Sequence, residues 1–185
     1  MTLIFAVILA CVLCLITGCT STSNVPPPAI EPTPVVTVQP TESPTETPVS
    51  ELTVHFIDVG QADAAVLQCG DDTMMIDGGN VADSSLIVAY LKKLNIDNID
   101  YMVCTHAHED HVGGLSAPLS VMPISAVYAP SAEADSKAYQ NFKQKAADQN
   151  TEIMHPENYE SFPFGSARVE ILACPDNADN LNNTS

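Results

Sequence analysis

The chain has 185 residues, which suits a single domain by length, and 45% of them are hydrophobic. Its 23 acidic and 6 basic side chains give a formal net charge of −17, and no Lys or Arg precedes Lys92. This charge has the wrong sign for holding a phosphate backbone through counterion release or for adsorbing to an anionic membrane surface. The simplest interpretation is a solvated acidic surface on a secreted protein, part of which a bound cation would offset.

The first 19 residues have the composition of an export signal. Residues 3–16 are apolar and uncharged, too short a run for a membrane span but suited to the core of a secretory signal. Leu15–Cys19 (LITGC) resembles the lipobox of bacterial lipoproteins, where the residue matching Cys19 is lipidated and becomes the mature N-terminus. The first two residues carry no basic side chain, and an uncleaved anchor is the alternative. Either way, we expect the rest of the chain to be extracytoplasmic and anchored to the bacterial cell membrane.

A proline-rich segment follows the signal. Eight of the chain's 14 prolines lie between Thr20 and Ser50, among Ser, Thr, Val and Glu. Proline removes a backbone donor and restricts φ, so this composition opposes a packed element. We expect residues 20–50 to be an extended linker between the anchor and a domain that starts at Glu51.

From Glu51 the pattern is typical of strands and helices. An opening meander of strands is predicted at Leu52–Asp58, Ala64–Cys69 and Thr73–Asp77. Further strands are predicted at Asn98–Cys104, Ala126–Tyr128 and Arg168–Ala173, the last after a turn at Phe162–Gly165. Apolar residues at a 3.6-residue period predict helices over Ser84–Leu94 and Ala132–Gln149, and a shorter one within Val112–Leu119. Strands and helices that alternate in this way predict a layered α/β domain.

The densest chemistry lies in Thr105–Gly114 (THAHEDHVGG). This stretch holds three of the chain's five histidines, together with Asp110. His106 and His108 leave a predicted strand two residues apart, so both imidazoles can face one point, while Asp110 and His111 follow a turn and can face a neighbouring point. Imidazole and carboxylate suit Zn²⁺, with Mn²⁺ or Fe as alternatives. We predict a site for two divalent metal ions; a polar loop with ordinary hydrogen bonds is the competing interpretation.

The segment HAHEDH resembles the HxHxDH motif of the metallo-β-lactamase superfamily. Its flanks resemble the metallo-β-lactamase-like domain of the competence family that includes DNA-uptake channel proteins. Three segments carry the resemblance in the family's order and spacing: residues 55–63 (HFIDVGQAD), 75–79 (MIDGG) and 105–115. It implies an αββα sandwich with the metal ions at one edge of the sheets.

The resemblance also implies roles for single residues. It assigns two ligands to each metal ion: His106 and His108 to the first, Asp110 and His111 to the second. Asp58 and Asp77 match positions near the site and are expected to orient ligands or loops, with plain turn-forming aspartates as the alternative.

The superfamily takes further ligands from later in its chain: a histidine, a bridging aspartate and a last histidine. Here only His155 follows His111, and Asn182–Ser185 resembles the start of the strand that leads to the bridging aspartate. We therefore expect residues 51–185 to be the N-terminal part of the domain, inactive by itself. Cys174 stands where a histidine is expected; we interpret it as a buried core cysteine, with zinc ligation as the alternative.

The leading functional hypothesis is a metal-dependent hydrolase that cleaves phosphodiester or ester-like bonds outside the cytoplasm. The resemblance to the competence family makes nucleic acid a candidate substrate, although the acidic charge opposes it. The alternative is a non-catalytic, surface-displayed binding domain that keeps the fold. Hydrolysis of β-lactams is a third hypothesis, supported only by the superfamily motif. No protein partner is predicted.

Overall fold

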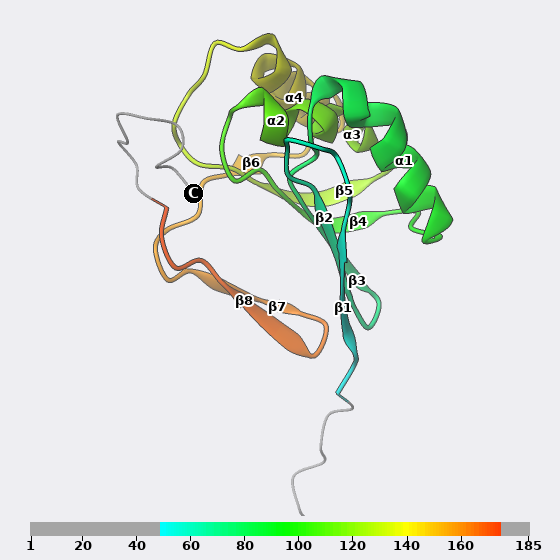
Figure 1. The fold of residues 1–185 in the computed structure, drawn as a ribbon. Helices are drawn as coiled ribbons and strands as arrows, with labels where there is room; N and C mark the ends of the chain where they lie inside the picture. The colour runs from blue at the N-terminus through cyan, green and yellow to red at the C-terminus, as the bar shows by residue number, and fades with distance from the viewer. Residues whose placement is uncertain (1–48, 175–185) are drawn as a thin grey trace, which may run out of the picture. The chain divides into compact units, whose positions relative to one another are not determined.

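A computed structural model describes residues 49–174 of the chain (Figure 1). The predicted signal peptide with Cys19, the linker up to residue 48, and Asn182–Ser185 lie outside the described residues. Among the helices of residues 49–174, none combines the length and apolarity of a membrane span.

The strands of this region form one sheet of six and one sheet of two. The larger sheet runs in chain order: β1 (Leu52–Phe56), β2 (Ala65–Cys69), β3 (Asp72–Ile76), β4 (Ile99–Val103), β5 (Ile124–Tyr128) and β6 (Ile153–Met154). The pairs β1–β2 and β2–β3 are antiparallel, and β3 to β6 are parallel neighbours. The carboxyl ends of five strands, β1 and β3 to β6, therefore lie at one edge of the sheet.

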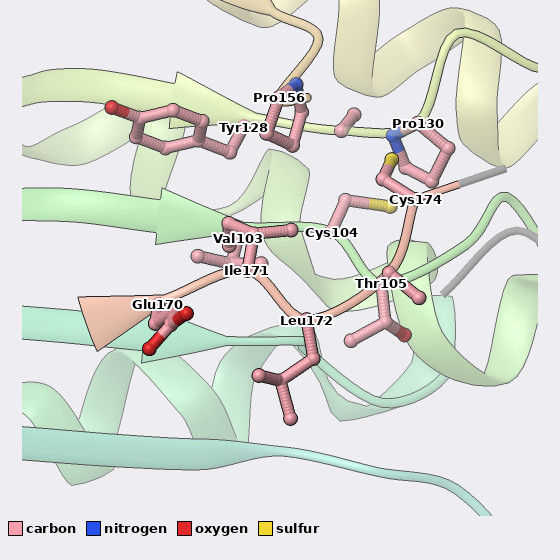
Figure 2. A pocket seen from close by; sticks show the side chains of 12 residues that line it. Val103, Cys104, Thr105, Tyr128, Pro130, Pro156, Glu170, Ile171, Leu172 and Cys174 are labelled. Carbon is pink, nitrogen blue, oxygen red and sulfur yellow. The ribbon is translucent and has the colours of Figure 1, made fainter. Parts of the chain in front are cut away.

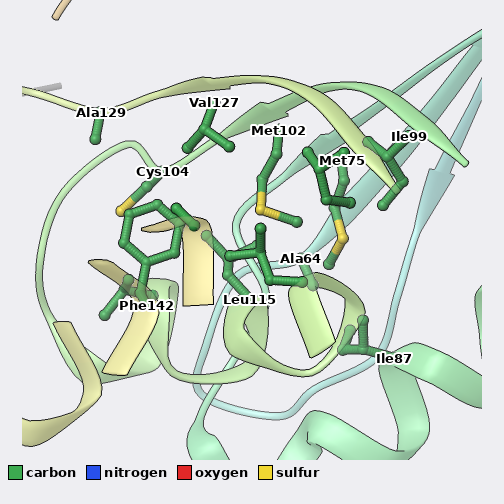
Figure 3. Close-up of a cluster of buried hydrophobic side chains, with 14 of the residues drawn as sticks. Ala64, Met75, Ile87, Ile99, Met102, Cys104, Leu115, Val127, Ala129 and Phe142 are labelled. Atoms are coloured by element: carbon green, nitrogen blue, oxygen red, sulfur yellow. The ribbon is translucent and has the colours of Figure 1, made fainter. Parts of the chain in front are cut away.

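The helices cover one face of this sheet (Figure 1). They are η1 (Val81–Asp83), α1 (Ser84–Lys93), α2 (Glu109–Val112), η2 (Gly113–Ser116), α3 (Pro118–Val121) and α4 (Lys137–Asp148). Between sheet and helices lies the main core, in which Met75, Met102 and Val127 from adjacent strands contact Leu115 and Phe142 (Figure 3). All five are fully buried.

A hairpin covers part of the opposite face. Its strands are β7 (Ser161–Phe164) and β8 (Ala167–Glu170). The Phe162 ring stacks on Tyr101 of β4 and Tyr128 of β5, with centroids 4.7 Å and 5.1 Å away. Met74 and Tyr101 on this face alternate with Met75 and Met102 on the helical face, so the central strands are buried on both sides, as expected for parallel strands. The mixed α/β prediction is confirmed, with a helical layer, a large sheet and a second sheet in that order.

Several predicted elements differ in detail. The strand predicted at Arg168–Ala173 is β8, which ends at Glu170, and the short helix predicted within Val112–Leu119 is divided between α2, η2 and α3. The helix predicted from Ala132 begins at Lys137, because the side chain of Ser136 accepts a hydrogen bond from the Tyr139 amide at 3.2 Å and caps the first turn. The predicted turn at Phe162–Gly165 is strand β7, and the chain reverses at Gly165. Pro163 misled the prediction: it lies in a two-stranded hairpin, where a missing donor is tolerated.

Candidate functional site

The candidate site lies where the parallel strands end. Beyond strand β3, the Asp77 amide donates to the Val103 carbonyl at 2.9 Å, and beyond β4 the Cys104 amide donates to the Tyr128 carbonyl at 2.9 Å. These bonds continue the parallel ladder past the strands. They bring the loop after β3 beside Thr105, the residue directly before the first histidine.

The loop after β3 is packed backbone-to-backbone against the histidine segment. Gly78 N donates to the His111 carbonyl at 2.7 Å, and Gly114 N donates to the Gly79 carbonyl at 3.1 Å. A Cβ on Gly114 would lie 1.9 Å from the Gly78 oxygen, and one on Gly78 would lie 2.6 Å from the Leu115 amide nitrogen. Both positions require glycine because the two backbones touch.

The three imidazoles of the segment are clustered. The His106 ring lies 4.9 Å from that of His108 and 3.9 Å from that of His111, between centroids. His106 is 6% exposed, and its Nδ1 lies 3.1 Å from Thr105 Oγ1. Burial and the neighbouring His111 lower the pKa of His106, so its imidazole is neutral at pH 7, the form that binds metal ions.

Asp77 connects the loop after β3 to this cluster. The residue is 2% exposed, and its carboxylate accepts from Thr105 N at 2.8 Å and Thr105 Oγ1 at 2.6 Å. It also accepts from His111 Nδ1 at 2.8 Å. A carboxylate can only accept, so Nδ1 of His111 carries a proton, and in the neutral imidazole Nε2 then keeps its lone pair for a ligand.

Two carboxylates lie beside that free nitrogen. His111 Nε2 is 3.6 Å from Asp63 Oδ2 and 3.9 Å from Asp110 Oδ2. The Asp63 amide also donates to the Asp110 carbonyl at 3.1 Å. Sequence reasoning gave Asp63 no role, and its only signal was its position in the segment HFIDVGQAD.

Asp58 is placed differently from Asp77. It is exposed, and its carboxylate accepts from the amide of Gly60 at 3.2 Å. This contact corresponds to the alternative interpretation of Asp58 as an aspartate that forms a turn. Glu109 is also exposed, and its carboxylate accepts from Val81 N at 3.3 Å. His155 donates from Nδ1 to the Ala129 carbonyl at 2.9 Å. Cys174 is buried, as are Cys69 and Cys104.

The imidazole and carboxylate groups of the histidine segment are of the chemical types that bind a divalent metal ion. Nε2 of His106 is one of two buried side-chain polar atoms in residues 49–174 that have no hydrogen-bond partner, the other being Ser116 Oγ. Burying such an atom costs free energy unless a ligand or a water molecule binds to it. As the side chains lie, however, no three His, Cys, Asp or Glu residues of this region form a ready metal-binding group. Binding an ion therefore requires side-chain rearrangement around His106 and His111.

Comparison with known proteins identifies one matching family and several solved structures that are similar to this chain. The family described as the Metallo-beta-lactamase superfamily matches residues 57–156, more than half of the chain. No curated protein matches.

Three solved structures illustrate the similar folds. The metallo-beta-lactamase SMB-1 bound to 2-mercaptoethanesulfonate is 20% identical over 63% of this chain and 49% of its own, with a TM-score of 0.48. A Cronobacter sakazakii metallo-beta-lactamase with a HARLDQ motif is 19% identical over 60% and 46%, with a TM-score of 0.42. A flavo di-iron protein mutant from Thermotoga maritima is 16% identical over 58% and 26%, with a TM-score of 0.42. The chain spans less than half the length of each.

Proposed function

The chain belongs to the metallo-beta-lactamase superfamily, which includes metal-dependent hydrolases, and on that basis we propose that it hydrolyses phosphodiester or ester-like bonds outside the cytoplasm. The observation that carries this proposal is the buried, unpartnered Nε2 of His106 within a cluster of three imidazoles. Among the explanations for a buried polar atom without a partner is a bound ion, and the imidazole cluster around His106 favours that explanation here.

The proposed ligands are those of the histidine segment. His106 and His108 would hold one divalent ion, and Asp110 and His111 a second. Zinc suits this donor set best, with manganese and iron as alternatives. When bound, such ions supply Lewis acidity and a water molecule of lowered pKa.

The protein's own groups prepare these ligands. Asp77 holds the proton of His111 on Nδ1 and, through Thr105, restrains His106. The backbone bond from Gly78 to His111 keeps helix α2, which carries Asp110 and His111, at the sheet edge. These contacts fix the backbone and the tautomer of His111 before an ion arrives, whereas the ligand side chains still have to rearrange to bind it.

Metal content and turnover test the proposal together. We expect the purified chain to retain zinc, and His106→Ala and His108→Ala to lose it. His55→Ala is the matched control, since His55 lies on β1 and its Nε2 is 3.3 Å from Gln68 Oε1. In a form of the protein that supplies the later superfamily ligands, we also expect hydrolysis of bis(p-nitrophenyl) phosphate or p-nitrophenyl acetate that a chelator abolishes and zinc restores. Equal metal content in all four proteins would refute the assignment.

The proposal also covers where the protein is located and which substrate it acts on. The LITGC segment supports a lipoprotein with residues 1–19 as its signal, residues 20–50 as its linker and Cys19 as the lipidated residue. The chain would then contact the membrane through its anchor. The competence-like motifs support nucleic acid as one candidate substrate. Incorporation of labelled palmitate that Cys19→Ala abolishes and Cys14→Ala preserves would support the anchor; equal labelling of both would contradict it.

A non-catalytic binding domain is the second candidate. It is favoured by one observation: within residues 49–174 no three donors are arranged as a metal-binding group. Zinc retained without chelator-sensitive hydrolysis of either substrate would favour this function over the hydrolase.

A further inference from the structure

An apolar pocket of about 340 Å³ lies beside the candidate metal centre (Figure 2). Its walls come from four parts of the chain: the end of β4 with the residues after it, the end of β5 with Pro130, Pro156 after β6, and the end of β8 with the segment that follows it. The volume falls at the lower end of the range for small-molecule sites, which favour the ends of parallel strands.

Thr105 links the pocket to the metal centre. It lines the pocket, and its Oγ1 lies 3.1 Å from Nδ1 of His106. The next residue back, Cys104, also lines the pocket and lies 3.1 Å by its Sγ from the His106 carbonyl oxygen. A molecule that occupies the pocket therefore sits next to the residue that carries the unpartnered nitrogen.

The lining excludes an anionic occupant. Its side chains are almost all apolar, with Tyr128, Ile171 and Leu172 among the larger ones, and its one charged residue is the carboxylate of Glu170. None of the chain's six basic side chains lines it. A phosphate group here would meet a negative charge and find no cation, whereas a neutral hydrocarbon group would bury apolar surface.

We propose that this pocket binds the neutral, apolar acyl group of a carboxylic ester substrate. This inference rests on the proposed hydrolase and selects uncharged esters over nucleic-acid phosphodiesters. In the reaction, the bond between the carbonyl carbon and the alcohol oxygen breaks. The oxygen of a water molecule bonds to that carbon, and the protons of the water leave with the alcohol and the acid. The acyl chain occupies the pocket while the ester bond lies beside His106.

A binding experiment without metal tests the pocket independently of catalysis. The probe is N-phenyl-1-naphthylamine, a neutral dye that fluoresces in apolar surroundings, titrated into the full metal-free chain. Leu172→Asp places a charge in the lining at a side chain that is 69% exposed, so folding is preserved. The matched control is Val121→Asp, at a 58% exposed side chain on α3, outside this pocket. We expect the dissociation constant to rise at least fivefold in Leu172→Asp and to stay unchanged in Val121→Asp.

A second variant tests whether filling the pocket, without adding a charge to its lining, also prevents dye binding. Ala173 lines the pocket and is exposed, so Ala173→Trp adds bulk to the wall without disturbing the core, and we expect it to exclude the dye. Equal binding to wild type, Leu172→Asp and Ala173→Trp would overturn the proposal. Failure of the dye to bind wild type would also overturn it, since protein would then fill the space.

Hydrolysis by the zinc-loaded protein, in the form that supplies the later superfamily ligands, tests the substrate class. For p-nitrophenyl esters from acetate to hexanoate, we expect kcat/KM to rise about fourfold per added methylene, which is the value of burying one CH₂ group at about 0.8 kcal/mol. Ala173→Trp should flatten this series. A flat series in wild type, or a preference for bis(p-nitrophenyl) phosphate, overturns the ester assignment. Absence of all hydrolysis with intact dye binding overturns the proposed hydrolase instead and leaves the pocket as an apolar binding site.

Discussion

Asp77→Asn is the sharpest test of how the candidate site is built. The amide has the same shape as the carboxylate, and asparagine tolerates the left-handed backbone that Asp77 adopts at φ 55°. The amide oxygen can still accept from Thr105 N. The amide nitrogen, however, replaces the oxygen that accepts from both Thr105 Oγ1 and His111 Nδ1. The substitution therefore changes the hydrogen bonding of this one atom and removes the charge of the carboxylate.

We expect Asp77→Asn to lower both the stability of the fold and the affinity for zinc. Two hydrogen bonds to a buried charged group are removed, and at about 1.5–3 kcal/mol each, with partial compensation by the Thr105 hydroxyl, the free energy of unfolding should fall by about 2–4 kcal/mol. The amide also donates toward His111 Nδ1, which moves the imidazole proton to Nε2 and blocks the atom that would bind metal. We expect zinc to bind about 10–100-fold more weakly, as for other partners of metal ligands.

Two measurements separate these two effects. Urea unfolding with chelator present reports the stability of the metal-free chain, and titration against a chromophoric chelator reports the zinc dissociation constant. Asp58→Asn is the matched control, because its exposed carboxylate accepts from Gly60 N, and both values should remain as in wild type. An unchanged zinc dissociation constant in Asp77→Asn would refute the orienting role.

Three further predictions concern packing and ionisation. Gly114→Ala should lower the free energy of unfolding by about 3 kcal/mol, the upper end for overpacking, because its Cβ would meet the Gly78 oxygen and backbone cannot move aside; an unchanged urea midpoint would contradict the close approach. Burial, with a smaller effect of Glu133, raises the pKa of Tyr139 from 10.0 to about 12. Between pH 10 and 12 the native chain therefore holds a proton that the unfolded chain releases, so stability should fall across that range in wild type and fall less in Tyr139→Phe, as measured by urea midpoints. Burial raises the pKa of the Cys104 thiol far above its ordinary value, so mass spectrometry should find it unmodified by iodoacetamide at pH 8 in the native chain and modified in urea; modification at equal rates in both would show that it is not buried.

Local patterns predicted most of the elements. The 3.6-residue period of Ser84–Leu94 predicted α1, which ends one residue earlier, and the alternation from Leu52 predicted β1. These predictions succeed because periodicity reflects which side chains face the core, whatever covers them. The strand β7 was missed because it contains a proline, which has no backbone N–H to donate. A strand tolerates proline only where its pairing needs no donor at that position, and the sequence alone does not show the pairing.

The sequence by itself determined the family and the proposed donors, because His106, His108, Asp110 and His111 lie within one short segment whose spacing is readable without a structure. The tertiary structure decided which aspartates contact the histidines of this segment. Asp77 reaches His111 because β3 and β4 are parallel neighbours in a register that brings their carboxyl ends together, whereas Asp58 ends in a solvent-exposed turn. Both aspartates follow a strand and look alike in the sequence; the order of strands in the sheet separates them, since that order is set by long-range packing rather than by neighbouring residues.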